Sequence, residues 1–66
     1  MPIVKLANYQ NAGFTYVNAD NVMYFSEVGY NGVPGTELYL VTGKKFITSY
    51  FPEKVKELLE EADNGN

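Results

Sequence analysis

The last quarter of the chain carries the pattern of one amphipathic α-helix, directly after a body with strand-like patterns. Apolar residues recur there at the spacing of a single helix face, at Phe51, Val55, Leu58, Leu59 and Ala62. Pro52 suits the first turn of such a helix, because its missing N–H would have no partner there. The pattern predicts a helix over about residues 50–62, and this helix gives a sheet an apolar surface to pack against.

Runs of β-branched and aromatic residues precede the helix and are separated by Gly, Asn, Asp and Pro. The segment 29–35 holds three glycines and a proline, and it predicts a hairpin connection longer than a tight two-residue turn. Thr42 to Lys44 reads as a tight reversal. The predicted strands are residues 3–6, 14–17, 22–28, 36–41 and 45–49. We therefore expect one α+β domain over residues 1–66, a small antiparallel sheet of four to five strands followed by one C-terminal helix packed on it.

The small size of the chain predicts self-association. A domain of 66 residues buries only ~60% of the surface that its unfolded chain exposes, so its core is marginal. Cysteine and histidine are both missing, which removes disulfides and the usual zinc ligands as sources of stability. Oligomerisation is the common alternative. We expect a homo-oligomer, most simply a homodimer, and no metal or cofactor.

The strand predicted at residues 22–28 has apolar side chains on both faces, with Tyr24 on one and Met23 and Phe25 on the other. Such a strand is typically covered on both sides, here by the helix and by a partner subunit. The residues predicted to form this interface are Tyr16, Met23, Phe25 and Tyr39.

The net charge of −3 belongs entirely to the helical region, because three lysines balance three acids before residue 51. A duplex-binding face needs clustered Lys and Arg, and this chain has no arginine. The acidic balance therefore disfavours nucleic acid as a partner. The residues left for such a role are the adjacent turn lysines and two tyrosines, which form the predicted nucleic-acid-binding set Lys44, Lys45, Tyr30 and Tyr39.

The missing histidine and cysteine also exclude the usual Ser–His, Cys–His and zinc-hydroxide mechanisms. Glu27 and Glu37 flank the predicted hairpin loop, and we interpret them as two exposed charges at strand ends rather than a catalytic pair. We expect no enzymatic activity and no catalytic residues. The chain has no long apolar run and no visible signal peptide, so we expect a cytoplasmic protein without a membrane partner.

The chain resembles FlbD-type small proteins of flagellar operons and, more distantly, the strand-rich DNA-binding domain called LytTR. Three stretches carry this resemblance, namely residues 17–22, 36–46 and 53–59. LytTR domains contact DNA through basic and polar loop residues, and the residues here that match in kind are Asn18, Asn21, Lys44 and Lys45. The order of four strands and a helix is also similar to that of dimeric coactivator domains that bind single-stranded DNA.

Three functions remain open from the sequence. The first is a small acidic, non-enzymatic interaction or regulatory module that self-associates through sheet faces or edges and also suits a protein partner. The alternative is a nucleic-acid-binding protein, for single-stranded DNA or in the manner of LytTR, that uses the turn lysines and strand tyrosines. The third is an acidic inhibitor of an enzyme that acts on nucleic acid.

Overall fold

A computed structural model of the protein describes residues 2–64 and confirms the α+β class with a C-terminal helix. The helix begins and ends two residues later than predicted, and the five strands match the predicted segments to within a few residues at each end. The elements are β1 (Ile3–Ala7), β2 (Phe14–Asn18), the short 3₁₀ helix η1 (Ala19–Asn21), β3 (Val22–Tyr30), β4 (Val33–Leu40), β5 (Lys45–Thr48) and α1 (Pro52–Asn64).

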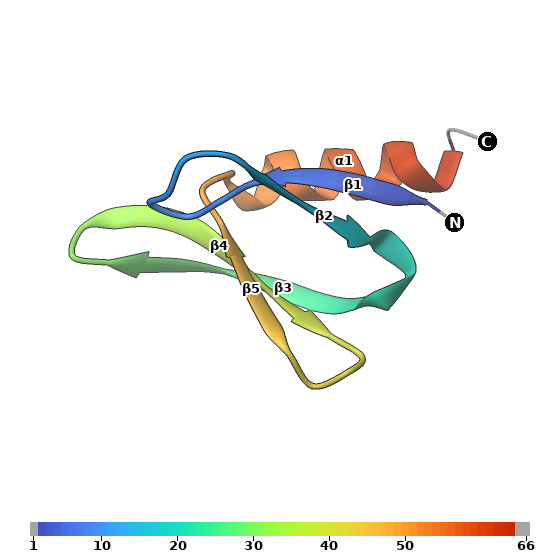
Figure 1. Ribbon diagram of the computed structural model, residues 1–66, viewed down its shortest axis with the longest axis horizontal. Helices are drawn as coiled ribbons and strands as arrows, with labels where there is room; N and C mark the ends of the chain where they lie inside the picture. Colours follow the sequence, from blue (N-terminus) through green and yellow to red (C-terminus); the bar gives the residue numbers. More distant parts are fainter. Residues whose placement is uncertain (1, 65–66) are drawn as a thin grey trace.

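The strands form two antiparallel sheets, where the sequence predicted one. β1 pairs with β2, and β4 lies between β3 and β5 in a sheet of three (Figure 1). The two sheets are hydrogen-bonded to each other where β1 ends, through an isolated bridge between Asn8 and Thr48 and a bond from the Ser49 N–H to the Ala7 carbonyl. β1 and β5 form no further pairs beyond this point, so the five strands make two sheets rather than one continuous sheet.

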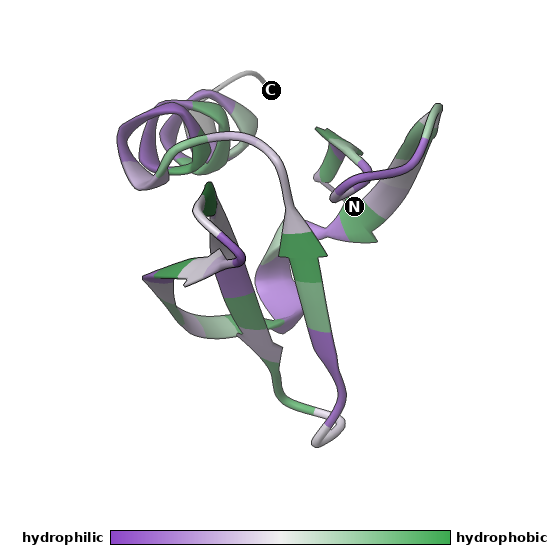
Figure 2. Ribbon diagram, turned by 90° about the vertical axis from the view of Figure 1, so that its left-hand side faces the viewer, coloured by the Kyte–Doolittle hydropathy of each residue, from purple (hydrophilic) through white to green (hydrophobic). Residues whose placement is uncertain are grey.

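The core lies between the two sheets and the helix. Side chains alternate along β1, where Val4 and Leu6 are buried and their neighbours Ile3 and Lys5 are exposed. Figure 2 shows the hydrophobic side of α1 turned toward the strands and its hydrophilic side turned outward. The buried apolar side chains form one cluster of Val4, Leu6, Val17, Leu38 and Val55.

Only part of the predicted apolar helix face is buried. Val55 is completely buried, and Leu58 and Leu59 are half-buried against the core. Phe51 precedes the helix and is 56% exposed, so its predicted place in the core is wrong. Its carbonyl instead accepts the N–H of Val55, which closes the first helical turn.

The connection between β3 and β4 is a tight two-residue turn, which corrects the longer loop predicted for residues 29–35. Tyr30 pairs directly with Val33, and the strands continue through Gly29 and Pro34. Asn31 and Gly32 make the turn with φ of 53° and 79°. Positive φ at both central positions is the geometry that matches strand twist, and an Asn-Gly pair favours it. The glycines and proline beside this pair were wrongly taken as parts of a loop.

A β-bulge at Met23 changes which β3 side chains share a face. The register shifts between Val22 and Tyr24, so Met23 has no opposite residue on β4. After the bulge, Phe25 pairs with Leu38 and packs against the core. Met23 and Phe25 therefore do not form the shared outer face that strict alternation predicted.

Candidate interaction surfaces

The side of the three-stranded sheet that faces away from the core carries one aromatic cluster. Tyr24 on β3 and Tyr39 on β4 are cross-strand neighbours, and their rings stack with centroids 4.4 Å apart and 17° between the planes. Lys45 on β5 is the opposite neighbour of Tyr39, with Nζ 5.9 Å from the centroid of that ring. Tyr24 remains 57% exposed. This surface, which we call the tyrosine face, offers an exposed ring, a half-buried ring stacked on it, and an ammonium group side by side.

Glu37 lies on the same side of the sheet and is buried, which corrects the prediction of an exposed strand-end charge. It sits in the middle of the central strand, where Ser26 and Ile47 flank it on the neighbouring strands. Its carboxylate accepts a hydrogen bond from the Tyr39 hydroxyl at 2.8 Å. Glu27 is exposed and pairs with Thr36, so it projects from the opposite side of the sheet, and the two acids do not converge.

The contact with Glu37 raises the pKa of the Tyr39 hydroxyl above its ordinary value. The hydrogen bond to the carboxylate is the largest cause, because it requires the proton to stay on the tyrosine, and burial and the negative charge of Glu37 act in the same direction. The raised pKa means that this contact contributes stability below about pH 10 and that the contribution is lost as the pH rises through the pKa of the folded protein.

We expect an alkaline titration, followed by the ultraviolet absorbance of tyrosinate, to show Tyr39 ionising above the ordinary pKa of tyrosine. The substitution Glu37→Gln removes the carboxylate and should move this tyrosine to lower pH. The matched control is Glu27→Gln, because Glu27 is exposed on the opposite side of the sheet. A late step that persists in Glu37→Gln would contradict the assignment to Tyr39.

The outer edge of β3 is the longest strand edge that pairs with no other strand among residues 2–64. Tyr30 and Val33 flank a two-residue turn and so form a hydrogen-bonded pair, after which bonded and non-bonded pairs alternate. Ser26 therefore bonds to β4, while the N–H and C=O groups of Glu27 and Gly29 point away from the sheet. These outward groups are free to pair with a further strand.

Beyond its one bulge, this edge lacks the usual protection against pairing. Edge strands commonly carry lysine or proline, which discourage the addition of another strand. β3 has neither, and its single charged residue is Glu27. Its large apolar side chains are exposed instead, with Met23 and Tyr24 each 57% and Tyr30 47% exposed. An edge of this kind presents a row of backbone groups with which another strand can pair.

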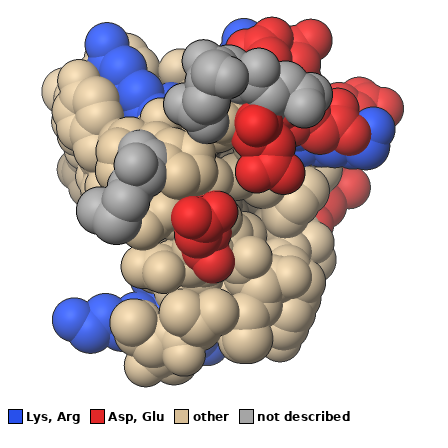
Figure 3. Space-filling view, turned by 90° about the vertical axis from the view of Figure 1, so that its right-hand side faces the viewer, with Lys and Arg blue, Asp and Glu red and all other residues tan. Residues whose placement is uncertain are grey.

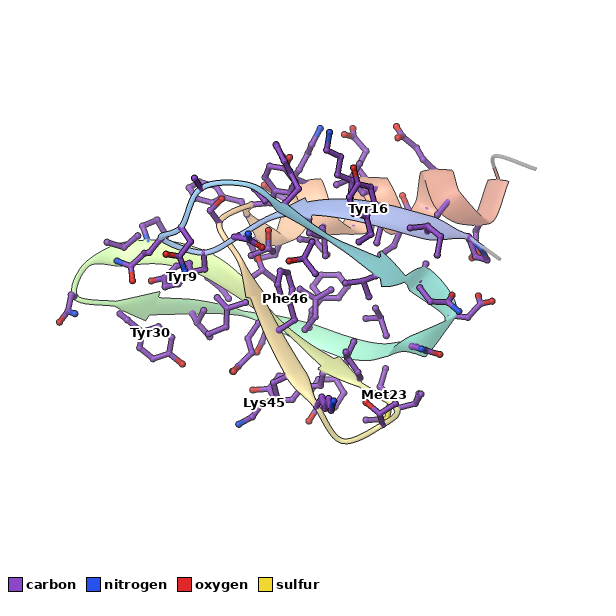
Figure 4. The ribbon with its side chains drawn as sticks, in the orientation of Figure 1. Tyr9, Tyr16, Met23, Tyr30, Lys45 and Phe46 are labelled. Carbon is purple, nitrogen blue, oxygen red and sulfur yellow. The ribbon has the colours of Figure 1, made fainter. Side chains whose placement is uncertain are left out.

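The structure divides the predicted nucleic-acid-binding residues between two ends of β4. Lys45 and Tyr39 adjoin each other, and Lys44 lies in the turn beside them. Tyr30 is at the other end, opposite Val33, roughly 20 Å away along the strand at ~3.4 Å per residue. Figure 4 shows Tyr30 next to Tyr9 there, and the two rings meet edge to face with centroids 6.1 Å apart.

The predicted interface residues are also divided. Met23 and Tyr39 lie at the same end of the three-stranded sheet, and Tyr16 is exposed on β2, in the other sheet. Phe25 packs against the core, so its ring is not offered to a partner. Tyr24 is absent from both predicted sets, although the sequence placed it in a strand, where its exposed ring stacks on that of Tyr39.

A pocket of about 350 Å³ opens between β2, the end of β4 and the β4–β5 turn. Its apolar floor includes Val17, Leu40 and Phe46, which also belong to or pack against the core. The four polar residues that match the LytTR resemblance in kind, namely Asn18, Asn21, Lys44 and Lys45, are all among the residues that line it. The pocket is lined by Thr15, Tyr16, Val17, Asn18, Asn21, Leu40, Lys44, Lys45 and Phe46.

Acidic side chains are most numerous on the helix. Figure 3 shows them gathered over α1 with lysine atoms beside them, one acidic side chain apart from them, and further lysine atoms projecting at the end that holds the β4–β5 turn. The two ion pairs among residues 2–64 both lie on the helix, where Lys54 approaches Glu57 at 3.8 Å and Lys56 approaches Glu60 at 3.3 Å. Exposed pairs of this kind stabilise only slightly. Lys44 and Lys45 make no ion pair within the described chain.

Comparison of the chain with protein-family models, curated proteins and solved structures finds no match in any of the three. Across residues 2–64, no three Asp or Glu side chains are grouped so that they could hold a metal ion. No helix in this range has both the length and the apolar character needed to cross a membrane. The surfaces described above are therefore the basis for a functional proposal.

Proposed function

We propose that the protein is a non-enzymatic, cytoplasmic interaction module that forms a homodimer by pairing the outer edges of two β3 strands. The observation that carries this proposal is the nine-residue edge with outward backbone groups and no lysine or proline. Pairing two copies about a twofold axis would join two three-stranded sheets into one of six strands and satisfy the outward groups of both copies.

We place the axis at Ser26, the midpoint of β3, because the whole strand then pairs with its copy. In this register Glu27 lies opposite Phe25 of the partner subunit. An axis at Glu27 would set two carboxylates directly opposite each other, which destabilises a strand pair. The exposed side chains of Met23, Tyr24 and Tyr30 would add apolar contact beside the paired backbones.

The accessible surface of the single chain is not unusually large, so it does not by itself require a partner subunit. Its accessible surface is 4364 Å², close to the ~4200 Å² expected for a monomer of 7.4 kDa. The case for a dimer therefore rests on which groups are exposed. A typical interface of about 800 Å² per partner would cover roughly a fifth of this surface.

The substitution Glu27→Pro tests the edge directly. Because the Glu27 N–H points away from β4, proline at this position removes a group needed for pairing but no bond within the monomer. We expect sedimentation to show twice 7.4 kDa for the unaltered chain and 7.4 kDa for the proline variant. Glu27→Thr is the control, because it keeps the N–H and should remain dimeric. The proposal is disproved if the unaltered chain stays monomeric at millimolar concentration.

The tyrosine face supports a second candidate function, binding of single-stranded nucleic acid. The exposed ring of Tyr24, stacked on the half-buried ring of Tyr39 beside Lys45, combines an aromatic surface for bases with a cation for phosphate. The acidic balance of the chain weighs against it. If it is correct, oligothymidine binding falls steeply with added salt, and Tyr24→Ala abolishes it while Tyr16→Ala, on the other sheet, does not. Absence of binding to oligothymidine at low salt would exclude this function.

A further inference from the structure

The pocket between β2 and β5 combines unpaired strand backbone with an apolar hollow of about 350 Å³. The β1–β2 register has Ala19 donating to Pro2 at one end and Asn8 donating to Gly13 at the other. Bonded pairs alternate between these ends, so Val17 and Thr15 bond to β1. Tyr16 falls in a non-bonded pair opposite Lys5, and its N–H and C=O point away from β1, on the side of β2 that lines the pocket.

The opposite wall of the pocket is a second strand edge. In the β4–β5 hairpin the Leu40 N–H donates to the Lys44 carbonyl, so Phe46 bonds to β4 and the backbone groups of Lys45 point outward. Figure 4 shows Phe46 on the side of β5 that faces β2, and Lys45 projecting away from it. Backbone from both edges thus borders an apolar floor that includes Leu40.

The charge of the pocket is one-sided. Its lining contains Lys44 and Lys45 and no Asp or Glu. The side chain of Lys45 is directed toward the ring of Tyr39 on the tyrosine face, so Lys44 is the cation left at the rim. Lys44 is exposed and has no ion pair within residues 2–64. An anionic group on an occupant would therefore meet an uncompensated ammonium.

We propose that this pocket binds an extended acidic peptide, which adds as a strand to the free edge of β2. The backbone of the peptide would bond to the N–H and C=O of Tyr16, as in other cases of strand addition. Alternate side chains of a strand point to opposite faces, so an apolar residue reaches the floor at Phe46 while an adjacent carboxylate reaches Lys44. The volume of about 350 Å³ suits one or two side chains, so affinity for a short peptide is modest.

The test uses an N-acetylated, C-amidated pentapeptide that alternates isoleucine and glutamate, titrated into the full chain and followed by amide chemical shifts. Two further peptides serve as controls, one with lysine in place of glutamate and one with a central proline. We expect saturable shifts along β2 and slower hydrogen exchange at the Tyr16 amide with the acidic peptide only. Repeating the titration on Glu27→Pro separates the result from dimerisation, because this variant should bind equally well.

The substitution Lys44→Glu reverses the rim charge and should weaken binding about tenfold or more. Lys56→Glu makes the same change of charge on the exposed helix and should leave binding within about twofold. The proposal is overturned if the acidic peptide gives no saturable shifts, if all three peptides bind alike, or if the two lysine variants lose affinity equally. Oligothymidine that shifts the same β2 amides in place of the peptide would also overturn it.

Discussion

Replacing Val55 with aspartate is expected to abolish the cooperative unfolding of the protein. Val55 is fully buried, in contact with the core that both sheets contribute to, and it holds α1 against them. A carboxylate at this position would have no basic partner, because every lysine of the chain is exposed. An uncompensated buried charge costs several kcal/mol. A domain of this size has only about 3–10 kcal/mol of stability at ~0.05–0.15 kcal/mol per residue.

Circular dichroism during heating measures this effect. The unaltered chain should give a sigmoidal transition, and Val55→Asp should give a gradual slope with loss of the near-ultraviolet tyrosine signal. Lys56→Asp is the matched control, because it places the same residue one position later on the exposed side of α1. Leu58→Asp should lower the stability by an intermediate amount. Leu58 is half-buried, so the carboxylate of an aspartate at this position keeps some contact with water. A cooperative transition in Val55→Asp at the temperature of the control would show that α1 does not hold the core together.

The elements of the fold could be predicted from the sequence because each is encoded within a few neighbouring residues. The helix follows from the apolar spacing around Val55, and the β4–β5 hairpin follows from alternation on both sides of Gly43. The Asn31–Gly32 turn was also encoded locally, yet the neighbouring glycines and proline led to a longer loop in the prediction. A bulge such as that at Met23 adds one residue to one strand, and it breaks the alternation on which the prediction of strand faces depended.

The division into two sheets could not be predicted, because it depends on how far β1 and β5 pair with each other. They pair at only one position, between residues 40 positions apart in the sequence. The bridge of Asn8 with Thr48 joins the sheets, and no local pattern encodes where β1 and β5 separate. The candidate pocket depends on the same long-range arrangement, since Tyr16 and Lys44 line one pocket only once β2 has been placed near the β4–β5 hairpin. The burial of Glu37 was hidden for a similar reason, because its partners come from both neighbouring strands.

The substitution Gly35→Ala is the second change with a large expected effect, although it adds only one methyl group. A Cβ at this buried position would lie 2.6 Å from the Thr48 carbonyl oxygen and 2.8 Å from a ring carbon of Tyr9. Tyr9 cannot move away freely, because its hydroxyl donates to the Val33 carbonyl at 2.6 Å. Overpacking of this kind costs about 2 kcal/mol. For a domain of this size we therefore expect a Tm lower by roughly 8–16 °C.

Gly29→Ala is the control for this prediction, because the nearest atom to its Cβ is the Val33 carbonyl oxygen at 3.8 Å. Its Tm should change little, since alanine fits this exposed strand position without strain. The background Tyr9→Ala then tests the cause. If the ring is part of the obstruction, Gly35→Ala costs less stability in that background. The double variant then loses less stability than the sum of the losses in the two single variants. Losses that add fully would leave the Thr48 carbonyl as the sole obstruction, because the backbone of β5 remains in place in both variants.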